Sequence, residues 1–91
     1  MVAARAANVV LMFYVSVLKS LVDKRLYKGL TKDLNKRVKE HNSGWTRSTK
    51  AYRPWKLVYF ERFQTLHEAR EREKYLKSGI GREFLKNILD S

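Results

Sequence analysis

The sequence predicts a single α+β domain whose elements follow one another in the order strand, strand, helix, strand, helix, helix. Strand-like apolar segments alternate with segments whose apolar residues recur at helical spacing. The connections between them are short, and no repeat or low-complexity tract divides the chain. With 91 residues and a hydrophobic fraction of 44%, the chain has enough apolar material for one small core.

Two strands are expected at the start of the domain. Residues 10–18 (VLMFYVSVL) are almost entirely apolar, which is typical of a strand covered on both faces. The polar residues 20–25 predict a hairpin loop, and residues 26–30 (LYKGL) predict a second, shorter strand. Residues 1–9 are interpreted as a frayed leader, so the domain is expected to span residues 10–91.

A helix, a loop and the third strand are expected next. Thr31 is the predicted N-cap of the helix, which ends near His41 because the following Asn-Ser-Gly at 42–44 is typical of a helix end. Residues 45–53 predict a loop. Pro54 is expected to open the third strand, because proline is tolerated at the first position of a strand.

Two helices complete the predicted domain. Thr65 and Glu68 have the spacing of a capping box, so a helix is expected to begin there and to run to about Lys77. Residues 78–81 (SGIG) predict a break, and residues 82–89 predict a last short helix.

Positive charge is concentrated in the first two thirds of the chain. Of the net charge of +11, residues 1–60 contribute +10 and residues 61–91 only +1. A field of one sign repels itself, so it usually serves a polyanionic partner. Nucleic acid is favoured over an anionic membrane, because no long basic amphipathic helix is visible. A basic surface that only keeps the protein soluble is the alternative.

The residue types that the chain lacks exclude several kinds of site. With no Cys and two His, the sequence excludes a disulfide scaffold, a thiolate zinc site and a cysteine nucleophile. A metal would need carboxylate ligands, which favours a hard cation such as Mg²⁺. No apolar run approaches the roughly 20 residues of a membrane span. The absence of Cys fits a reducing, cytoplasmic location.

One carboxylate interrupts the apolar face of the helix that follows Thr65. Leu66, Ala69 and Leu76 would form its buried stripe, and the position that completes the stripe is Glu73. An inward-facing carboxylate is costly unless it is paired or binds a metal. Glu73 is therefore a metal ligand or general base, or else it pairs with an arginine, or the apolar stripe is simply narrow.

Arg37 and His41 lie one turn apart on the first helix and border its few apolar positions. A guanidinium binds two phosphate oxygens at once, so a phosphate clamp is one interpretation. Solvated charge on a basic helix is the other. His41 is equally open to being a cap that the helix dipole stabilises.

Basic and aromatic residues interleave in the loop before the third strand. Basic residues contact phosphates, and aromatic residues can stack on bases or sugars. Trp45 and Tyr52 are candidates for stacking, although Tyr52 is also open to being a core residue. Trp55 is expected in the core at the strand entrance, whereas the cations of this loop need a partner.

Four segments carry a resemblance to a known family. They are residues 13–20 (FYVSVLKS), 26–31 (LYKGLT), 34–42 (LNKRVKEHN) and 69–77 (AREREKYLK), with the tail 76–86 (LKSGIGREFLK). Each is weak alone, but their order and spacing resemble the GIY-YIG nuclease superfamily over about residues 11 to 90. The chain is most similar to the small stand-alone bacterial group related to the N-terminal nuclease domain of the repair excinuclease.

The resemblance implies a three-stranded antiparallel sheet flanked by helices, and hydrolysis of phosphodiester bonds in DNA with one divalent metal, Mg²⁺ or Mn²⁺. The tyrosine of the second motif corresponds to Tyr27, the expected general base. Arg37 would neutralise charge on the phosphate, and Glu73 would bind the metal. His41 would orient a phosphate or a water, and Gly29 would let the backbone pass close to the substrate.

The DNA is expected to be held through its phosphates, with low sequence specificity. The residues expected to bind it are Lys28, Lys36, Arg47, Lys50 and Arg53. The expected substrate is DNA, branched or nicked, in repair or processing. RNA is the less favoured nucleic acid, and the sequence indicates no protein partner.

Two positions depart from the family pattern. The first motif, at Tyr14, Val15 and Ser16, normally ends in tyrosine, and Ser16 keeps a hydroxyl but cannot reach as far. Lys28 replaces the isoleucine of the second motif, and strand alternation would turn it away from the site. The sequence therefore favours an active endonuclease. The alternatives are a DNA- or RNA-binding module with weakened or lost catalysis, and a basic protein whose partner is RNA, a ribosome or another protein.

Overall fold

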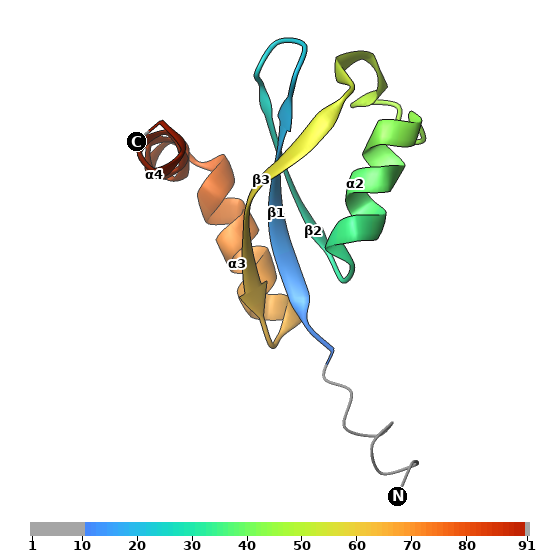
Figure 1. Cartoon of the computed structure of the whole chain (residues 1–91). Coiled ribbons are helices and arrows are strands. Elements are labelled where there is room, and N and C mark those ends of the chain that lie inside the picture. Colours follow the sequence, from blue (N-terminus) through green and yellow to red (C-terminus); the bar gives the residue numbers. More distant parts are fainter. Residues whose placement is uncertain (1–10, 91) are drawn as a thin grey trace, which may run out of the picture.

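A computed structural model describes residues 11–90 as one three-stranded sheet with helices packed on it (Figure 1). The central strand β1 is hydrogen-bonded to antiparallel neighbours on both sides, in the order β2-β1-β3. The strands are β1 (Phe13–Ser20), β2 (Leu26–Thr31) and β3 (Trp55–Phe63). The helices are α2 (Leu34–Ser43), the 3₁₀ helix η1 (Lys50–Tyr52), α3 (Leu66–Lys77) and α4 (Gly79–Leu89). The predicted fold class and element order are confirmed, and the predicted leader, residues 1–9, lies outside the described residues.

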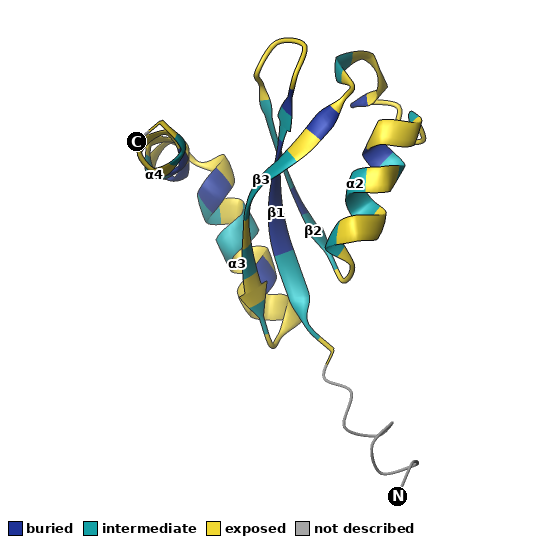
Figure 2. Cartoon of the chain, in the orientation of Figure 1, coloured by how far each residue is buried: buried dark blue, intermediate teal, exposed yellow. Residues whose placement is uncertain are grey.

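The main core lies between the sheet and the pair α3–α4. Alternate residues of a strand face opposite sides of its sheet, so the side chains of β1 pack into two layers, one on each face. Its fully buried middle is dark blue in Figure 2 and confirms the prediction of a strand covered on both faces. Each aliphatic side chain buried in this way stabilises the fold by about 1.5–3 kcal/mol. The buried members of the main core are Val15, Val17, Ala69, Leu76 and Leu85.

The other face of the sheet is covered by α2 and η1. The β1–β2 register pairs Ser16 with Gly29 and Leu18 with Tyr27, so these side chains share the face opposite to the main core. The β1–β3 register brings Trp55 opposite Ser20 on the same face. This second layer is small and polar, and it holds the buried His41 of α2.

The first hairpin begins later than predicted. β1 extends to Ser20 because Lys19 still pairs with Leu26, and Ser20 pairs with Trp55 of β3. The Ser20 hydroxyl accepts a hydrogen bond from Val22 N at 3.1 Å and donates one to a backbone oxygen at 2.7 Å. The turn therefore starts after this serine.

The predicted N-cap of the first helix is wrong. Thr31 remains in the sheet, paired with Tyr14, and its hydroxyl accepts from Asp33 N at 3.1 Å. Asp33 is the N-cap, because its carboxylate accepts from Lys36 N at 3.1 Å. The predicted helix end is confirmed, since Gly44 has the left-handed φ of 84° that suits glycine.

The junction between the last two helices is tighter than predicted. Thr65 caps α3 as expected, accepting from Glu68 N at 3.1 Å. The predicted four-residue break is a single residue, Ser78, which caps α4 by accepting from Gly81 N at 3.2 Å. A Cβ at Gly81 would collide with the carbonyl of Tyr75, so this glycine is required by close helix packing. Leu66 was expected in the buried stripe of α3, but it is 37% exposed.

Candidate active site

Tyr27 and Gly29 lie together on the α2 side of the edge strand β2. Their register partners, Leu18 and Ser16, face the same side. A Cβ at Gly29 would lie 3.3 Å from Cε2 of Tyr27 and 3.9 Å from a terminal nitrogen of Arg37. The absence of a side chain at Gly29 therefore leaves the space in which the phenol and the guanidinium meet.

Arg37 reaches this point from α2. Its guanidinium forms an ion pair of 3.6 Å with Glu40, one turn along the same helix. Its Nε atom is buried and has no hydrogen-bond partner. A solvated charge on a basic helix was one interpretation of this residue, but an orphaned buried donor beside Tyr27 contradicts it.

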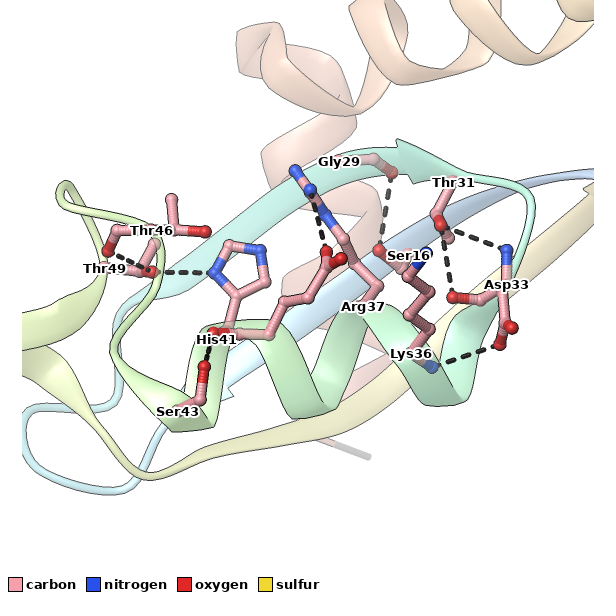
Figure 3. A network of polar contacts seen from close by, with 11 residues as sticks. Ser16, Gly29, Thr31, Asp33, Lys36, Arg37, His41, Ser43, Thr46 and Thr49 are labelled. Atoms are coloured by element: carbon pink, nitrogen blue, oxygen red, sulfur yellow. Dashed lines mark hydrogen bonds and ion pairs between the residues drawn. The ribbon is translucent and has the colours of Figure 1, made fainter.

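His41 is fully buried in the second layer, and its imidazole points toward Thr49 (Figure 3). Its Nδ1 lies 2.7 Å from the hydroxyl of Thr49, which itself lies 3.3 Å from the carbonyl of Thr46. We assign the one hydrogen of that hydroxyl to the Thr46 carbonyl, so the hydroxyl accepts the Nδ1–H of His41. The Nε2 atom then carries a lone pair, and it is buried without a partner.

Burial lowers the pKa of His41, and the nearby Arg37 charge lowers it further, against a smaller raising effect of Glu40. His41 is therefore held neutral. A charged cap stabilised by the helix dipole was an alternative for this residue. A buried, neutral imidazole does not fit that alternative.

Two aromatic rings fix the imidazole of His41 against the sheet. Its centroid lies 4.7 Å from that of Tyr27 and 6.4 Å from that of Trp55. Trp55 is a core residue, as expected, and its indole N–H donates to the carbonyl of Thr49 at 2.9 Å. The side-chain amide of Asn42 bonds the backbone N–H and C=O of Trp55, with distances of 2.6 and 3.0 Å.

Thr49 and Asn42 support the site but were not found in the sequence. Neither residue belongs to an apolar stripe or to a charged cluster, so periodicity gives no signal for them. They became partners of His41 and Trp55 only because η1 folds back onto α2. The one available signal was for Thr49, a polar residue in the loop that follows the candidate histidine His41.

The first motif contributes support to the sheet. Val15 belongs to the main core, and Tyr14 packs edge-on against Phe60 of β3 at a centroid distance of 6.1 Å. Ser16 is buried, and its hydroxyl donates weakly to the Gly29 carbonyl at 3.5 Å. The serine hydroxyl thus stays within the sheet, beside the space shared by Tyr27 and Arg37.

Glu73 lies on α3, on the other side of the sheet from Tyr27, Arg37 and His41. Its side chain is 23% exposed and pairs with Lys77 at 3.3 Å, one turn along the helix. The alternative of an ion pair with an arginine does not hold within residues 11–90, because the partner is this lysine. Within residues 11–90, no hydrogen bond or ion pair joins Glu73 to the residues on the α2 side.

The side chain of Lys28 lies on the opposite side of β2 from Tyr27. Lys28 lies between Tyr27 and Gly29 in the chain but faces α3 and α4, as strand alternation predicted. Burial lowers the pKa of its ammonium group, and the charges of Arg82 and Lys77 lower it further. Lys77 is also the partner of Glu73, so the carboxylate and Lys28 share a neighbour at the edge of the sheet.

The residues predicted to contact nucleic acid on the α2 side are exposed, and two of them, Lys50 and Arg53, lie close to each other. Arg53 Nε donates to the Lys50 carbonyl at 2.9 Å, and both side chains lie beside Gly44. Trp45 follows that glycine and is 77% exposed. Arg47 and Lys36 are exposed as well. Tyr52, in contrast, is covered by Arg25, whose guanidinium lies 3.6 Å from the ring centroid.

Metal-binding clusters and membrane spans are both missing from the described part of the chain. No group of three or more His, Cys, Asp or Glu residues gathers within residues 11–90 in a way that would hold an ion. Among the helices of these same residues, none has both the length and the apolar character needed to cross a bilayer.

Comparisons with known proteins identify the family of the chain. A family model described as the GIY-YIG catalytic domain matches residues 12–85. A UPF0213 protein of Clostridium perfringens is 48% identical over 67 residues, which cover 72% of this chain and 71% of that protein. The UPF0213 protein YazA of Bacillus subtilis is 46% identical over 66 residues, which cover 71% of this chain and 64% of that protein.

A solved structure has the same fold. It is the solution NMR structure of a UPF0213 protein from Bacillus halodurans, with 31% sequence identity and a TM-score of 0.53. The match covers 85% of this chain and 84% of that chain. Together with the family model, which spans most of the sequence, these similarities show that the chain belongs to the GIY-YIG family of nuclease domains.

Proposed function

We propose that this chain is a divalent-metal-dependent endonuclease that hydrolyses phosphodiester bonds in DNA, in repair or processing in the cytoplasm. The observation that carries the proposal is the pair of buried, unpartnered nitrogens, Arg37 Nε and His41 Nε2, beside Tyr27 and Gly29. An unsatisfied buried polar group costs about 1–3 kcal/mol. A phosphate bound beside the guanidinium of Arg37, with its attacking water at Tyr27, would bring new hydrogen-bond partners to this part of the site.

The side chains on the α2 side have complementary roles in this proposal. Arg37 donates to the phosphate and neutralises the charge that builds up on it. The phenolate form of Tyr27 accepts the proton of the attacking water, and the hydroxyl donates no hydrogen bond within the described residues. The neutral His41 offers Nε2 as an acceptor, which orients the phenol or the water.

Glu73 is the residue that would hold the metal. Mg²⁺ in phosphoryl-transfer sites commonly uses one or two carboxylates and fills its other positions with water and phosphate oxygens. A single carboxylate that is partly exposed and paired only with the flexible Lys77 fits this requirement. The bound cation would polarise the phosphate and stabilise the leaving oxygen. Glu73 would present its carboxylate oxygens to the cation, while Lys28 would bind the adjoining DNA backbone.

The cations on α2 and in the following loop would hold the DNA by its phosphates. Lys36, Arg47, Lys50 and Arg53 are exposed, and none of them has an acidic partner within residues 11–90. Trp45 offers an exposed ring next to Gly44 in the chain, and Lys50 and Arg53 lie beside that glycine, which suits stacking on an unpaired base. Contacts of this kind carry little sequence information.

A second candidate function rests on Ser16. Its hydroxyl is directed to the Gly29 carbonyl within the sheet, so it does not extend to the place where Arg37 and Tyr27 meet. A DNA- or RNA-binding module with weakened catalysis would result if the missing phenol is essential. Ser16→Tyr should then raise the rate of cleavage, and an unchanged rate would exclude Ser16 as the limiting residue.

Nicking of supercoiled plasmid at low salt with Mg²⁺ or Mn²⁺ tests the proposed activity. Wild type and Glu71→Ala, a control for another carboxylate on the same helix, should nick the plasmid. Tyr27→Phe and Glu73→Ala should lose about 100-fold or more of the rate, the usual size of an acid–base or metal contribution. Equal nicking by all four proteins, or none by wild type, would refute the proposal.

A further inference from the structure

A second cationic site lies on the α3–α4 side of the sheet, away from the residues that surround Tyr27. It is a hollow of about 280 Å³ between the β1–β2 hairpin and α4. The hairpin and α4 each contribute two cations, and leucines from β2 and α4 form its apolar part. The four cations that line it are Lys19, Lys24, Arg82 and Lys86.

The four cations of this hollow have no acidic partners. Within residues 11–90, none of their side chains forms an ion pair or a hydrogen bond. Asp90 also lines the hollow, but it lies beyond ion-pair distance of all four. Four like charges around one small space repel each other, and this repulsion lowers the stability of the fold unless an anion relieves it.

The edge strand that carries Tyr27 borders the hollow through Leu26. Lys28 lies close enough to Arg82 and Lys77 for both charges to lower its pKa, after the larger effect of burial. Lys77 in turn contacts Glu73. A row of cations therefore extends from the hollow, across Lys28, to the carboxylate that would bind the metal. Little of this row was evident in the sequence, where residues 61–91 have a net charge of only +1.

We propose that this hollow binds backbone phosphates of the DNA molecule that is bound at the nuclease site. The hollow lies on the opposite side of β2 from the basic loop, residues 45–53. This inference rests on the proposed function, because the proposed function identifies the anion bound in the hollow as nucleic acid. It implies that the bound DNA passes around the edge of the sheet. Bending an intact duplex along such a path costs free energy, since its persistence length is about 150 base pairs. A branch, a nick or a single-stranded tail supplies the necessary flexibility, so DNA with such a discontinuity is the preferred substrate.

Binding measurements without metal test this inference independently of cleavage. The hollow variant is Arg82→Gln/Lys86→Gln, and the matched control is Arg62→Gln/Lys74→Gln, which removes two cations outside the hollow. Fluorescence anisotropy in EDTA would compare a labelled intact duplex with the same duplex carrying a single-stranded branch, between about 50 and 200 mM salt. Thermal unfolding of each protein would verify that it is folded.

Wild type and the control variant should bind the branched DNA more tightly than the duplex. The hollow variant should lose that preference, and its salt slope on branched DNA should become shallower by about 2, since each lost phosphate contact removes about 0.9. Equal preference and equal slope in the hollow and control variants would overturn the inference while leaving the proposed nuclease intact. If wild type neither binds nor cleaves DNA, the proposed function itself fails.

Discussion

At the scale of single residues, the site is defined by a buried histidine whose protonation is fixed by its neighbours. Thr49 determines the tautomer of His41, and burial together with Arg37 keeps the imidazole neutral. The consequence is a lone pair on Nε2 that faces no protein donor within residues 11–90. A fixed acceptor next to a phenol is a useful arrangement for proton transfer, because it requires no reorganisation during the reaction.

The lowered pKa of His41 predicts how stability depends on pH. Between the folded pKa and the ordinary value of 6.5, the unfolded chain binds more protons than the folded one. The free energy of unfolding should therefore fall as pH decreases through this window, by at most about 1.4 kcal/mol per pH unit. Denaturant unfolding at a series of pH values measures this slope.

A matched pair of variants assigns the slope to one histidine. His67 is the other histidine of the chain, and it is exposed. His67→Gln should retain the pH dependence, whereas His41→Gln should reduce it, even if it also lowers the overall stability. A slope that is the same in both variants would mean that other groups cause it.

At the scale of elements, the tight junction of α3 and α4 determines where Glu73 lies. Ser78 ends one helix and caps the next, and Gly81 lets α4 approach the last turn of α3. The ion pair of Arg72 with Glu61 of β3, at 2.8 Å, joins α3 to the sheet. Glu73 follows Arg72 directly, so its position depends on both of these contacts.

The two glycines of this junction should respond in opposite ways to alanine. Gly81→Ala should destabilise the protein by about 1–3 kcal/mol, because the new Cβ meets the Tyr75 carbonyl. Gly79→Ala meets nothing within 4 Å and lies in a helix, so it should be neutral or stabilising by up to about 1 kcal/mol. Chemical denaturation of both variants measures the difference, and equal stability would contradict the packing described for Gly81.

The elements that the sequence predicted best were those with a strong local signal. The apolar run of β1, the Thr65 cap and the Gly44 helix end depend on neighbouring residues alone, and all three are confirmed apart from a shift in the bounds of β1. The Thr31 cap was wrong because a sheet contact with Tyr14 competes for that residue.

The part of the site that the sequence did not predict depends on tertiary contacts. Tyr27, Arg37 and His41 are brought together as the motifs suggested, but Glu73 lies across the sheet. The apolar periodicity of a helix does not specify which face of the sheet the helix covers. The same reason explains why Thr49 was not found.

At the scale of the whole molecule, positive charge covers more than the side predicted from the sequence. The basic loop and α2 account for one face, and the cations of the hairpin and α4 for another. Between them lies β2, with Tyr27 on one side and Lys28 on the other. A polyanion that contacts both faces would be centred on this edge strand.

The basic loop should contribute to DNA affinity without affecting sequence preference. Arg47→Gln/Lys50→Gln should weaken binding to unrelated duplexes by the same factor and make the salt slope shallower by about 2. Arg62→Gln/Lys74→Gln is again the control and should keep the wild-type slope. A loss confined to one DNA sequence would instead indicate direct contacts with base edges.

The central claim is that groups on the two sides of β2 act on one phosphodiester bond. Single-turnover cleavage by Arg37→Gln, Glu73→Gln and the double variant, at saturating protein with Mg²⁺, tests it most directly. Residues that act as a unit have non-additive effects on the rate. Each single variant should lose most of the activity, and the double variant should be hardly slower than the worse of the two. Losses that multiply, or a Glu73→Gln protein as fast as wild type, would contradict it.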